Sequence, residues 1–264
     1  MMIRFARPFM TALVVLAIAV LTAAGCGGDD NKDSGTKANV PANLTVGSDI
    51  PYPPFEFGKP PYQGFDLDVV REVAKGLGSK VTFKKTPFDT IFRDLAQGKF
   101  NLVVSAATIT PERAKTVDFS SSYFPADQSL MVKKGSSIKT VDDVDGKVIG
   151  AQLGTTGADY AKNKTKAKTV RTYDLVDDAF NALEAGQIEA VINDCPVSKY
   201  AEKAHQDLVV VQAIQTNELY GMAFAKGSDD LRNAVNDQLA KLKDNGGLEK
   251  ISQKWFGGEP CVLH

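Results

Sequence analysis

Residues 89–104 read DTIFRDLAQGKFNLVV, and residues 177–192, 88 positions further on, read DDAFNALEAGQIEAVI. Both stretches have apolar residues at helical spacing, then a glycine, then a short apolar run, which indicates a helix, a turn and a buried strand. The matching pairs are Asp89 and Asp177, Phe92 and Phe180, Leu95 and Leu183, Gly98 and Gly186, Phe100 and Ile188, Val103 and Val191, and Val104 and Ile192. The repeat predicts two similar lobes. Chance recurrence of a common helix-turn-strand pattern is the alternative.

The sequence before and within the first copy alternates between strand and helix patterns. Short apolar runs predict strands at 44–47, 81–83 and 102–104. Amphipathic spacing predicts helices at 65–77, which Gly78 ends, and at about 87–96. This alternation, with 148–152 paralleling 45–49, predicts an α/β fold with mostly parallel sheets.

The predicted strands lead into polar segments in both lobes. Ligands of open α/β sheets bind outside the carboxyl ends of the strands. We therefore expect a ligand cleft between the lobes, lined by residues from 49–52, 105–108, 152–156 and 193–194.

Arg113 follows Thr110 and Pro111, which are typical of the N-cap and first position of a helix. A cation in the first turn opposes the helix dipole, and a bound carboxylate would reverse that effect, because arginine offers a carboxylate two parallel donors. The alternative is an exposed arginine that pairs with Glu112 or Asp118.

Three other features each have a functional and a structural interpretation. The turn at 154–157, with Thr155 and Thr156, can present hydroxyl and N–H groups to an anion, although it lacks the ending of a nucleotide-binding loop. Asp194 either caps the helix that follows it or accepts hydrogen bonds from an ammonium group. Tyr52 and Phe88 either pack in the core or at its rim, or enclose an aliphatic ligand side chain.

The first 25 residues are typical of a secretory signal, because two arginines precede an apolar run over 9–24 that is too short to span a membrane comfortably. Small residues then lead into Cys26, which matches a bacterial lipidation site except that Ala23 stands where leucine is commonest. Cleavage that leaves a free Cys26 is the alternative. The polar segment 26–42 predicts a flexible tether. We therefore expect an exported lipoprotein, anchored to a membrane in the periplasm or at the cell surface.

Composition and charge exclude several classes of protein. The 264 residues are 43% hydrophobic with a net charge of −1, so the chain lacks the basic surface of a nucleic-acid-binding protein. The two histidines, His205 and His264, belong to no arrangement typical of a nucleophilic enzyme or a metal site, so we expect no catalytic residue, no cofactor and no metal. Cys195 and Cys261 suit a disulfide in an exported protein, and two separate thiols are the alternative.

Several motifs carry a resemblance to a known family. They are PFEF (54–57), GFDLD (64–68), TITPER (108–113), VDFS (117–120), LGTTG (153–157) and KWFG (254–257). Over about 44–256 the chain resembles the amino-acid-binding proteins of ABC importers, solute-binding protein family 3, which include glutamine-, histidine- and lysine/arginine-binding proteins. The resemblance implies a type II periplasmic-binding-protein fold. Lobe 1 would comprise 43–124 and 222–264, lobe 2 would comprise 128–217, and crossover strands at 123–127 and 218–221 would form the hinge.

The resemblance also implies roles for the residues of the cleft. Arg113 would bind the ligand α-carboxylate with the N–H groups of Thr108 and Thr156, and Asp194 would bind the α-ammonium with the Ala106 carbonyl. Tyr52 and Phe88 would pack the ligand stem, with Asp49, Gln152 and Asn193 at its tip. The predicted ligand-binding residues are Asp49, Tyr52, Phe88, Ser105, Ala106, Thr108, Arg113, Gln152, Thr155, Thr156, Asn193 and Asp194.

The ligand prediction rests on the tip of the cleft. Gln152 and Asn193 stand where the glutamine-binding members have lysine and histidine, and a buried Asp49 favours a cation. We therefore expect a monomer that binds arginine or lysine, with glutamine next, and delivers it by hinge closure to the permease of an ABC importer. The alternatives are a periplasmic cyclohexadienyl-type dehydratase on the same fold and the ligand-sensing domain of a receptor.

Overall fold

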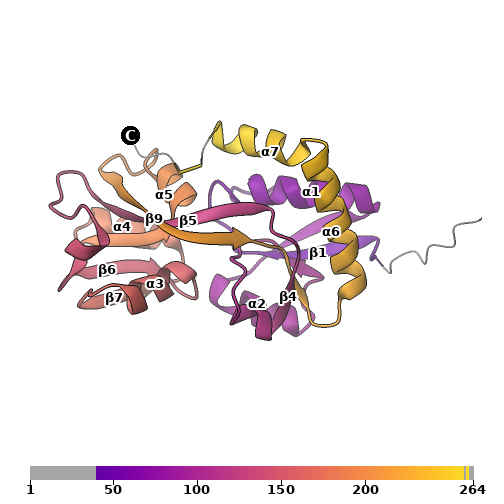
Figure 1. Cartoon of the computed structure of the whole chain (residues 1–264), viewed down its shortest axis with the longest axis horizontal. Coiled ribbons are helices and arrows are strands. Elements are labelled where there is room, and N and C mark those ends of the chain that lie inside the picture. The colour runs from indigo at the N-terminus through magenta and orange to yellow at the C-terminus, as the bar shows by residue number, and fades with distance from the viewer. Residues whose placement is uncertain (1–39, 259, 262–264) are drawn as a thin grey trace, which may run out of the picture. The chain divides into compact units, whose positions relative to one another are not determined.

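The computed structural model describes residues 40–258, 260 and 261. The predicted signal peptide (1–25), the lipidation site Cys26 and the predicted tether up to residue 39 lie outside the described residues. The described part of the chain forms two five-stranded sheets with helices packed on them (Figure 1). No helix in this part is both long enough and apolar enough to cross a membrane.

The first sheet has the strand order β2-β1-β3-β10-β4. β1 is parallel to β2 and β3, whereas β10 is antiparallel to β3 and β4. These strands are β1 (Asn43–Ser48), β2 (Lys80–Lys85), β3 (Leu102–Val103), β4 (Val117–Phe119) and β10 (Ala223–Ala225). The accompanying helices are α1 (Phe65–Leu77), α2 (Phe88–Ala96), the 3-10 turn η1 (Arg113–Lys115), α6 (Asp229–Asp244) and α7 (Gly247–Phe256).

The second sheet has the strand order β7-β6-β8-β5-β9. β6 is parallel to β7 and β8, whereas β5 is antiparallel to β8 and β9. These strands are β5 (Phe124–Lys133), β6 (Val148–Gln152), β7 (Thr169–Tyr173), β8 (Ala190–Asp194) and β9 (Leu208–Tyr220). The accompanying helices are η2 (Val141–Val144), α3 (Thr156–Lys164), α4 (Val176–Glu184) and α5 (Cys195–Ala201).

Alternate residues of the inner strands pack on different helices, as the period of a strand requires. In the first sheet, Leu102 and Val104 pack with the apolar face of α1, whereas Val103 packs with α2. In the second sheet, Val191 packs with α4, whereas Ile192 packs with α3. Figure 1 accordingly shows α1 and α2 on opposite sides of the first sheet.

The helices and strands predicted from the repeat are present. α2 and α4 begin and end 88 positions apart, and α1 ends where Gly78 adopts a left-handed φ of 72°. The expectation of mostly parallel sheets is corrected to mixed sheets. Each sheet has a three-stranded parallel core, β2-β1-β3 or β7-β6-β8, and the strand next to it, β10 or β5, runs antiparallel to that core.

The two predicted crossover segments are the paired ends of β5 and β9. Phe124 pairs with Tyr220 and Ala126 with Glu218, and the register shifts between Ala126 and Gln128. At that shift, the Asp127 carboxylate accepts hydrogen bonds from the backbone N–H groups of Thr216 and Asn217, each 2.9 Å long. The crossover strands therefore leave the second sheet at a defined irregularity.

A disulfide joins Cys195, the first residue of α5, to Cys261, with a Cα–Cα distance of 5.5 Å. The pairing that the sequence left open is therefore present. Because α5 packs on β5, β8 and β9, whereas α7, which precedes Cys261, packs on α1 and α6, the disulfide ties the second lobe to the end of the chain.

His205 lies between two acidic side chains of α4. Its nitrogens are 3.1 Å from Asp177 and 3.1 Å from Glu184. Burial lowers the pKa of His205, but hydrogen bonds to Glu184 and Asp177 outweigh it and raise the pKa above its usual value. His205 thus stabilises the fold fully below its unfolded-state pKa, and this contribution is lost as the pH rises through the raised folded-state pKa.

We therefore predict that His205→Gln lowers the free energy of unfolding most at pH 5.5, and progressively less at pH 7 and pH 8.5. Urea unfolding of both proteins at each pH measures the difference, in which the other titrating groups cancel. A difference that is constant or grows with pH would contradict this assignment.

Candidate functional site

One pocket collects nearly all of the predicted ligand-binding residues. It is lined by Asp49, Tyr52, Phe88, Ser105, Ala106, Thr108, Arg113, Gln152, Thr155, Thr156 and Asp194. They stand at the carboxyl ends of β1, β3, β6 and β8 and at the start of α2 and α3, as the topology predicts. Asn193 is the exception, because it lies behind Tyr52 and accepts a hydrogen bond of 3.0 Å from the tyrosine hydroxyl.

The two lobes are closed on each other in this structure. The space left between the lining side chains is about 10 Å³, roughly what one water molecule needs. Hydrogen bonds cross the cleft from Gln152 Nε2 to Asp49 (2.6 Å) and from the Tyr52 hydroxyl to Asp194 (2.7 Å). The polar groups of the site therefore satisfy one another across the cleft.

Arg113 begins a 3-10 turn of three residues rather than the predicted helix. The Thr110 hydroxyl accepts a hydrogen bond of 3.1 Å from the Arg113 N–H, but Thr110 is not the N-cap of this turn, because that position is occupied by Glu112. A single turn has no appreciable dipole for the arginine to oppose, so that part of the sequence argument is wrong.

The Arg113 guanidinium spans the cleft. It donates to the carbonyl of Thr108 (2.8 Å) and, in the other lobe, to the carbonyl of Gly154 (3.1 Å). It also lies over the rings of Phe88 and Phe92, 5.1 Å and 4.9 Å from their centroids. Burial lowers the pKa of Arg113, whereas the charges of Asp194 and Glu218 raise it, and the group keeps its charge.

The Asp194 side chain does not cap α5, although Asp194 occupies the N-cap position. Its carboxylate accepts hydrogen bonds from the hydroxyls of Tyr52 (2.7 Å) and Tyr220 (2.6 Å) and from Gln128 Nε2 (2.5 Å). Burial and the neighbouring charge of Glu218 raise its pKa to about 6, against the effect of these hydrogen bonds. The structure thus favours a binding role for Asp194 over a capping role.

Asp49 is the buried carboxylate at the other end of the pocket. It is only 2% exposed, and among the described residues Gln152 alone donates a side-chain hydrogen bond to its carboxylate. Burial raises its pKa to about 6, although the hydrogen bond from Gln152 and the charge of Lys85 lower it. Ionised Asp49 is therefore poorly compensated, and a cation brought against it would relieve that cost.

Thr155 and Thr156 begin α3, as the turn at 154–157 predicted. The Thr155 hydroxyl accepts a hydrogen bond of 3.1 Å from the Ala158 N–H and so caps the helix. Gly154, with a φ of +79°, makes the preceding turn at a place where a Cβ atom would lie 2.9 Å from the Asp89 Cα. The turn is thus held in close contact with the start of α2 in the other lobe.

Glu218 is a member of the site that the sequence analysis placed only in the hinge. Its carboxylate accepts hydrogen bonds from the hydroxyls of Thr108 (2.6 Å) and Thr156 (2.7 Å) and from Gln128 Nε2 (3.1 Å). The alternation of side chains along a strand could have identified Glu218 from the sequence. Glu218 and Tyr220 share one face of β9, whereas Leu219 between them lies on the other face and is 46% exposed.

Comparison with known proteins gives one consistent family. The family model described as bacterial extracellular solute-binding proteins, family 3, matches residues 44–258. The L-cystine-binding protein TcyJ of Escherichia coli K12 is 33% identical over 254 residues, covering 93% of this chain and 94% of that protein. Other relatives are named as glutamine- and arginine-binding proteins of Bacillus subtilis and a probable histidine-binding protein of Neisseria gonorrhoeae.

Two solved structures are similar over most of the chain. An ancestral arginine-binding protein bound to arginine has a TM-score of 0.78 and 38% identity, covering 82% of this chain and 99% of that one. The ancestral amino-acid-binding protein AncCDT-1, a precursor of cyclohexadienyl dehydratase, has a TM-score of 0.76 and 40% identity, covering 81% and 96%.

Proposed function

The chain belongs to the bacterial extracellular solute-binding proteins of family 3, and we propose that it binds a free L-amino acid with a cationic side chain, arginine or lysine, for delivery to the permease of an ABC importer. The observation that carries this proposal is the charge of the cleft. The lining of the pocket includes two carboxylates, those of Asp49 and Asp194, and one guanidinium, that of Arg113. A ligand with two cationic groups and one carboxylate gives each of these three groups a partner of opposite charge.

The ligand α-carboxylate is assigned to Arg113. The guanidinium lies in the cleft, where Nη1 and Nη2 each donate to one backbone carbonyl and keep a second N–H, and the rings of Phe88 and Phe92 beside it restrict its orientation. Arginine binds carboxylates in this bidentate manner. The N–H groups of Thr108 and Thr156 add donors from both lobes, as the resemblance implies.

The ligand α-ammonium is assigned to Asp194 and the Ala106 carbonyl. Asp194 is held in place by two tyrosine hydroxyls, so it needs no reorganisation to accept a further donor. Glu218, which already accepts from Thr108 and Thr156, adds a second negative charge on the same side. Tyr52 and Phe88 then line the path of the ligand side chain toward Asp49.

The side-chain cation is assigned to Asp49 and Gln152. An ionised carboxylate with a single side-chain donor is compensated better by a guanidinium or ammonium than by a neutral amide. Glutamine is the next candidate, because its NH2 group can donate to Asp49 while Gln152 donates to its carbonyl. The relative that binds cystine makes that amino acid a further candidate for testing.

The proposal includes export, tethering and closure. We assign 1–25 as a signal peptide, Cys26 as the lipid anchor, 26–42 as the tether, and 123–127 with 218–221 as the hinge between lobe 1 (43–124 and 222–264) and lobe 2 (128–217). The register shift at Asp127, where β5 and β9 leave the second sheet, supports this hinge. The protein is a monomer that alternates between open and closed forms, and the ligand favours the closed form.

A dehydratase is the second candidate function, because AncCDT-1 is named as a precursor of cyclohexadienyl dehydratase. Prephenate, a ring acid without an amine, would leave buried Asp194 without a cationic partner, which favours the amino acid over that substrate. Incubation with prephenate or arogenate, followed by a search for an aromatic product, separates the two functions.

We predict that arginine or lysine stabilises the protein most in a thermal-shift screen of the twenty amino acids and cystine. A ligand present at 100 times its Kd adds about 2.7 kcal/mol to the stability of a protein, which is roughly 5–10 °C in Tm for a domain of this size.

The control for this screen is Asp49→Asn. Removing the carboxylate removes the partner of the side-chain cation while keeping the volume, so this variant is expected to lose the preference for arginine over glutamine. An unchanged preference, or a wild-type protein that glutamine or cystine stabilises most, would overturn the assignment of a basic ligand.

A further inference from the structure

Two carboxyl groups that the binding scheme does not use lie buried beneath the pocket. Glu56 comes from the turn after β1 and Asp66 from the first turn of α1, and both residues are 0% exposed. Neither lines the pocket, yet each contacts a residue that does.

Each buried carboxyl holds part of the pocket floor. The Ser105 hydroxyl donates to Glu56 (2.7 Å) and accepts from the Asp49 N–H (2.9 Å), so Glu56 supports both Ser105 and the backbone at Asp49. Asp66 accepts from the Ala106 N–H (2.6 Å) and the Tyr123 hydroxyl (2.9 Å). Ala106 needs such support, because its φ of +44° is unusual for a residue other than glycine.

The remaining oxygen of each group is left without a hydrogen bond. Glu56 Oε2 and Asp66 Oδ1 are buried and have no hydrogen-bond partner among the described residues, while the other oxygens of the two groups hold the adjacent residues Ser105 and Ala106. Two neighbouring carboxylates without water cannot both stay ionised, whereas a proton between them gives one group a donor and the other an acceptor.

The electrostatics agree with this geometry. Burial, and then the charge of Asp66, raise the pKa of Glu56 well above its usual value. Burial raises the pKa of Asp66 to about 7, while hydrogen bonds from Ala106, Tyr123 and Glu56 lower it. Asp66 accepts two hydrogen bonds, from the Ala106 N–H and the Tyr123 hydroxyl, whereas Glu56 accepts one, from Ser105, so the proton is assigned to Glu56 and the charge to Asp66.

We propose that protonated Glu56 and ionised Asp66 form a proton-sharing pair that positions Ser105, Ala106 and, through Ser105, Asp49 for the ligand. Both are positioning residues, since neither touches the pocket. The inference rests on the proposed function in one respect only: it takes the ligand that binds above this part of the pocket to be an amino acid.

Glu56→Gln tests the pair, because glutamine has the shape and neutrality of a protonated glutamate and can donate to Asp66. We expect infrared spectra at pH 7.5 to show the carbonyl band of a protonated carboxyl in the wild type and in Glu249→Gln, an exposed control, but not in Glu56→Gln. Arginine should bind Glu56→Gln within about threefold of the wild type, and Glu56→Ala at least about tenfold more weakly, measured by calorimetry on folded protein.

A band that persists in Glu56→Gln, or a Glu56→Gln affinity as low as that of Glu56→Ala, would overturn the pair. If the wild type binds no amino acid, the proposed function fails, whereas the infrared result still decides whether the proton is shared.

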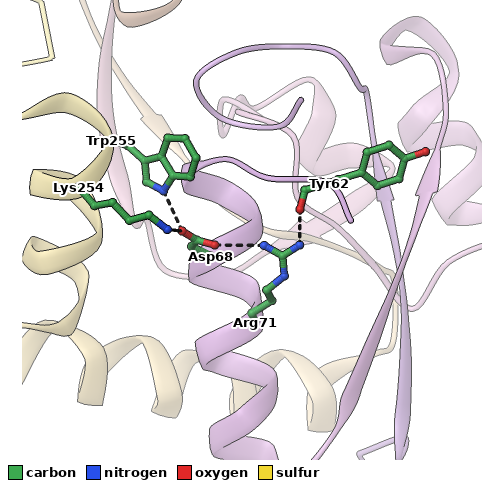
Figure 2. Close-up of polar contacts among 5 residues, drawn as sticks. All are labelled: Tyr62, Asp68, Arg71, Lys254 and Trp255. Atoms are coloured by element: carbon green, nitrogen blue, oxygen red, sulfur yellow. Dashed lines mark hydrogen bonds and ion pairs between the residues drawn. The ribbon is translucent and has the colours of Figure 1, made fainter. Parts of the chain in front are cut away.

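A separate observation concerns the end of the chain. α7 is fixed to α1 through Asp68, which accepts from Lys254 Nζ (2.6 Å), Trp255 Nε1 (2.8 Å) and Arg71 (3.1 Å). Figure 2 shows Asp68 between the α7 side chains and Arg71, which in turn donates to the Tyr62 carbonyl. The end of α7 is therefore anchored to the first lobe.

Beyond this anchor, the chain runs to the disulfide in the second lobe. Phe256 ends α7 and packs on Phe55 with 5.6 Å between ring centroids. Five residues later, Cys261 is bonded to Cys195, next to Asp194 of the site. Five residues span at most about 17 Å when fully extended.

We propose that the Cys195–Cys261 disulfide acts as a strap: it adds a third covalent connection between the lobes, which limits how far the cleft opens. Two crossover strands alone would set no limit to the opening other than the flexibility of the hinge itself. The strap sets such a limit, because Cys195 belongs to α5 in the second lobe, whereas Cys261 follows an α7 that Asp68 and Phe256 hold to the first lobe.

Cys261→Ser removes the connection and leaves the buried Cys195 thiol in place. We expect this variant, without ligand, to have a larger radius of gyration by X-ray scattering than the wild type, and to release arginine several-fold faster in stopped-flow measurements. Circular dichroism at the same temperature confirms that the variant is folded. An unchanged radius and an unchanged release rate would overturn the strap, and failure of the wild type to bind arginine would instead count against the proposed function.

Discussion

Buried charge in one small cleft is the constraint on which the rest of the structure depends. Arg113, Asp49 and Asp194 line one pocket that admits little water, and uncompensated charges in such a place cost several kcal/mol each. In the closed structure, protein groups meet part of this cost, since Gln152 donates to Asp49 and two tyrosines donate to Asp194. A ligand with two cationic groups and one carboxylate would replace this partial compensation with a full one.

The fold brings these charges together from distant parts of the chain. The repeat gives each lobe a parallel core of three strands, and the carboxyl ends of both cores face the same cleft. β5 and β9 join the lobes while also contributing Gln128, Glu218 and Tyr220 to the site. In the proposed function, these two strands are both hinge and binding surface, so closure and binding would act on the same residues.

Much of this arrangement could be predicted from the sequence, because it follows from local patterns. The period of the apolar residues fixes α2 and α4, and the polar ends of β1, β3, β6 and β8 contain most of the pocket. What could not be predicted depends on partners remote in sequence. Tyr52 and Tyr220 draw the Asp194 side chain away from α5, and the helix expected at Arg113 is a single turn that leads into β4. Glu218 belongs to the site only because the hydroxyls of Thr108 and Thr156, which come from different lobes, both donate hydrogen bonds to its carboxylate.

A crystal structure of the protein with bound arginine tests the central claim most directly. The account predicts one arginine between the lobes, with its α-carboxylate on Arg113, its α-ammonium on Asp194 and its guanidinium on Asp49. An arginine that reaches only one lobe, or whose carboxylate and ammonium contact neither Arg113 nor Asp194, would contradict it.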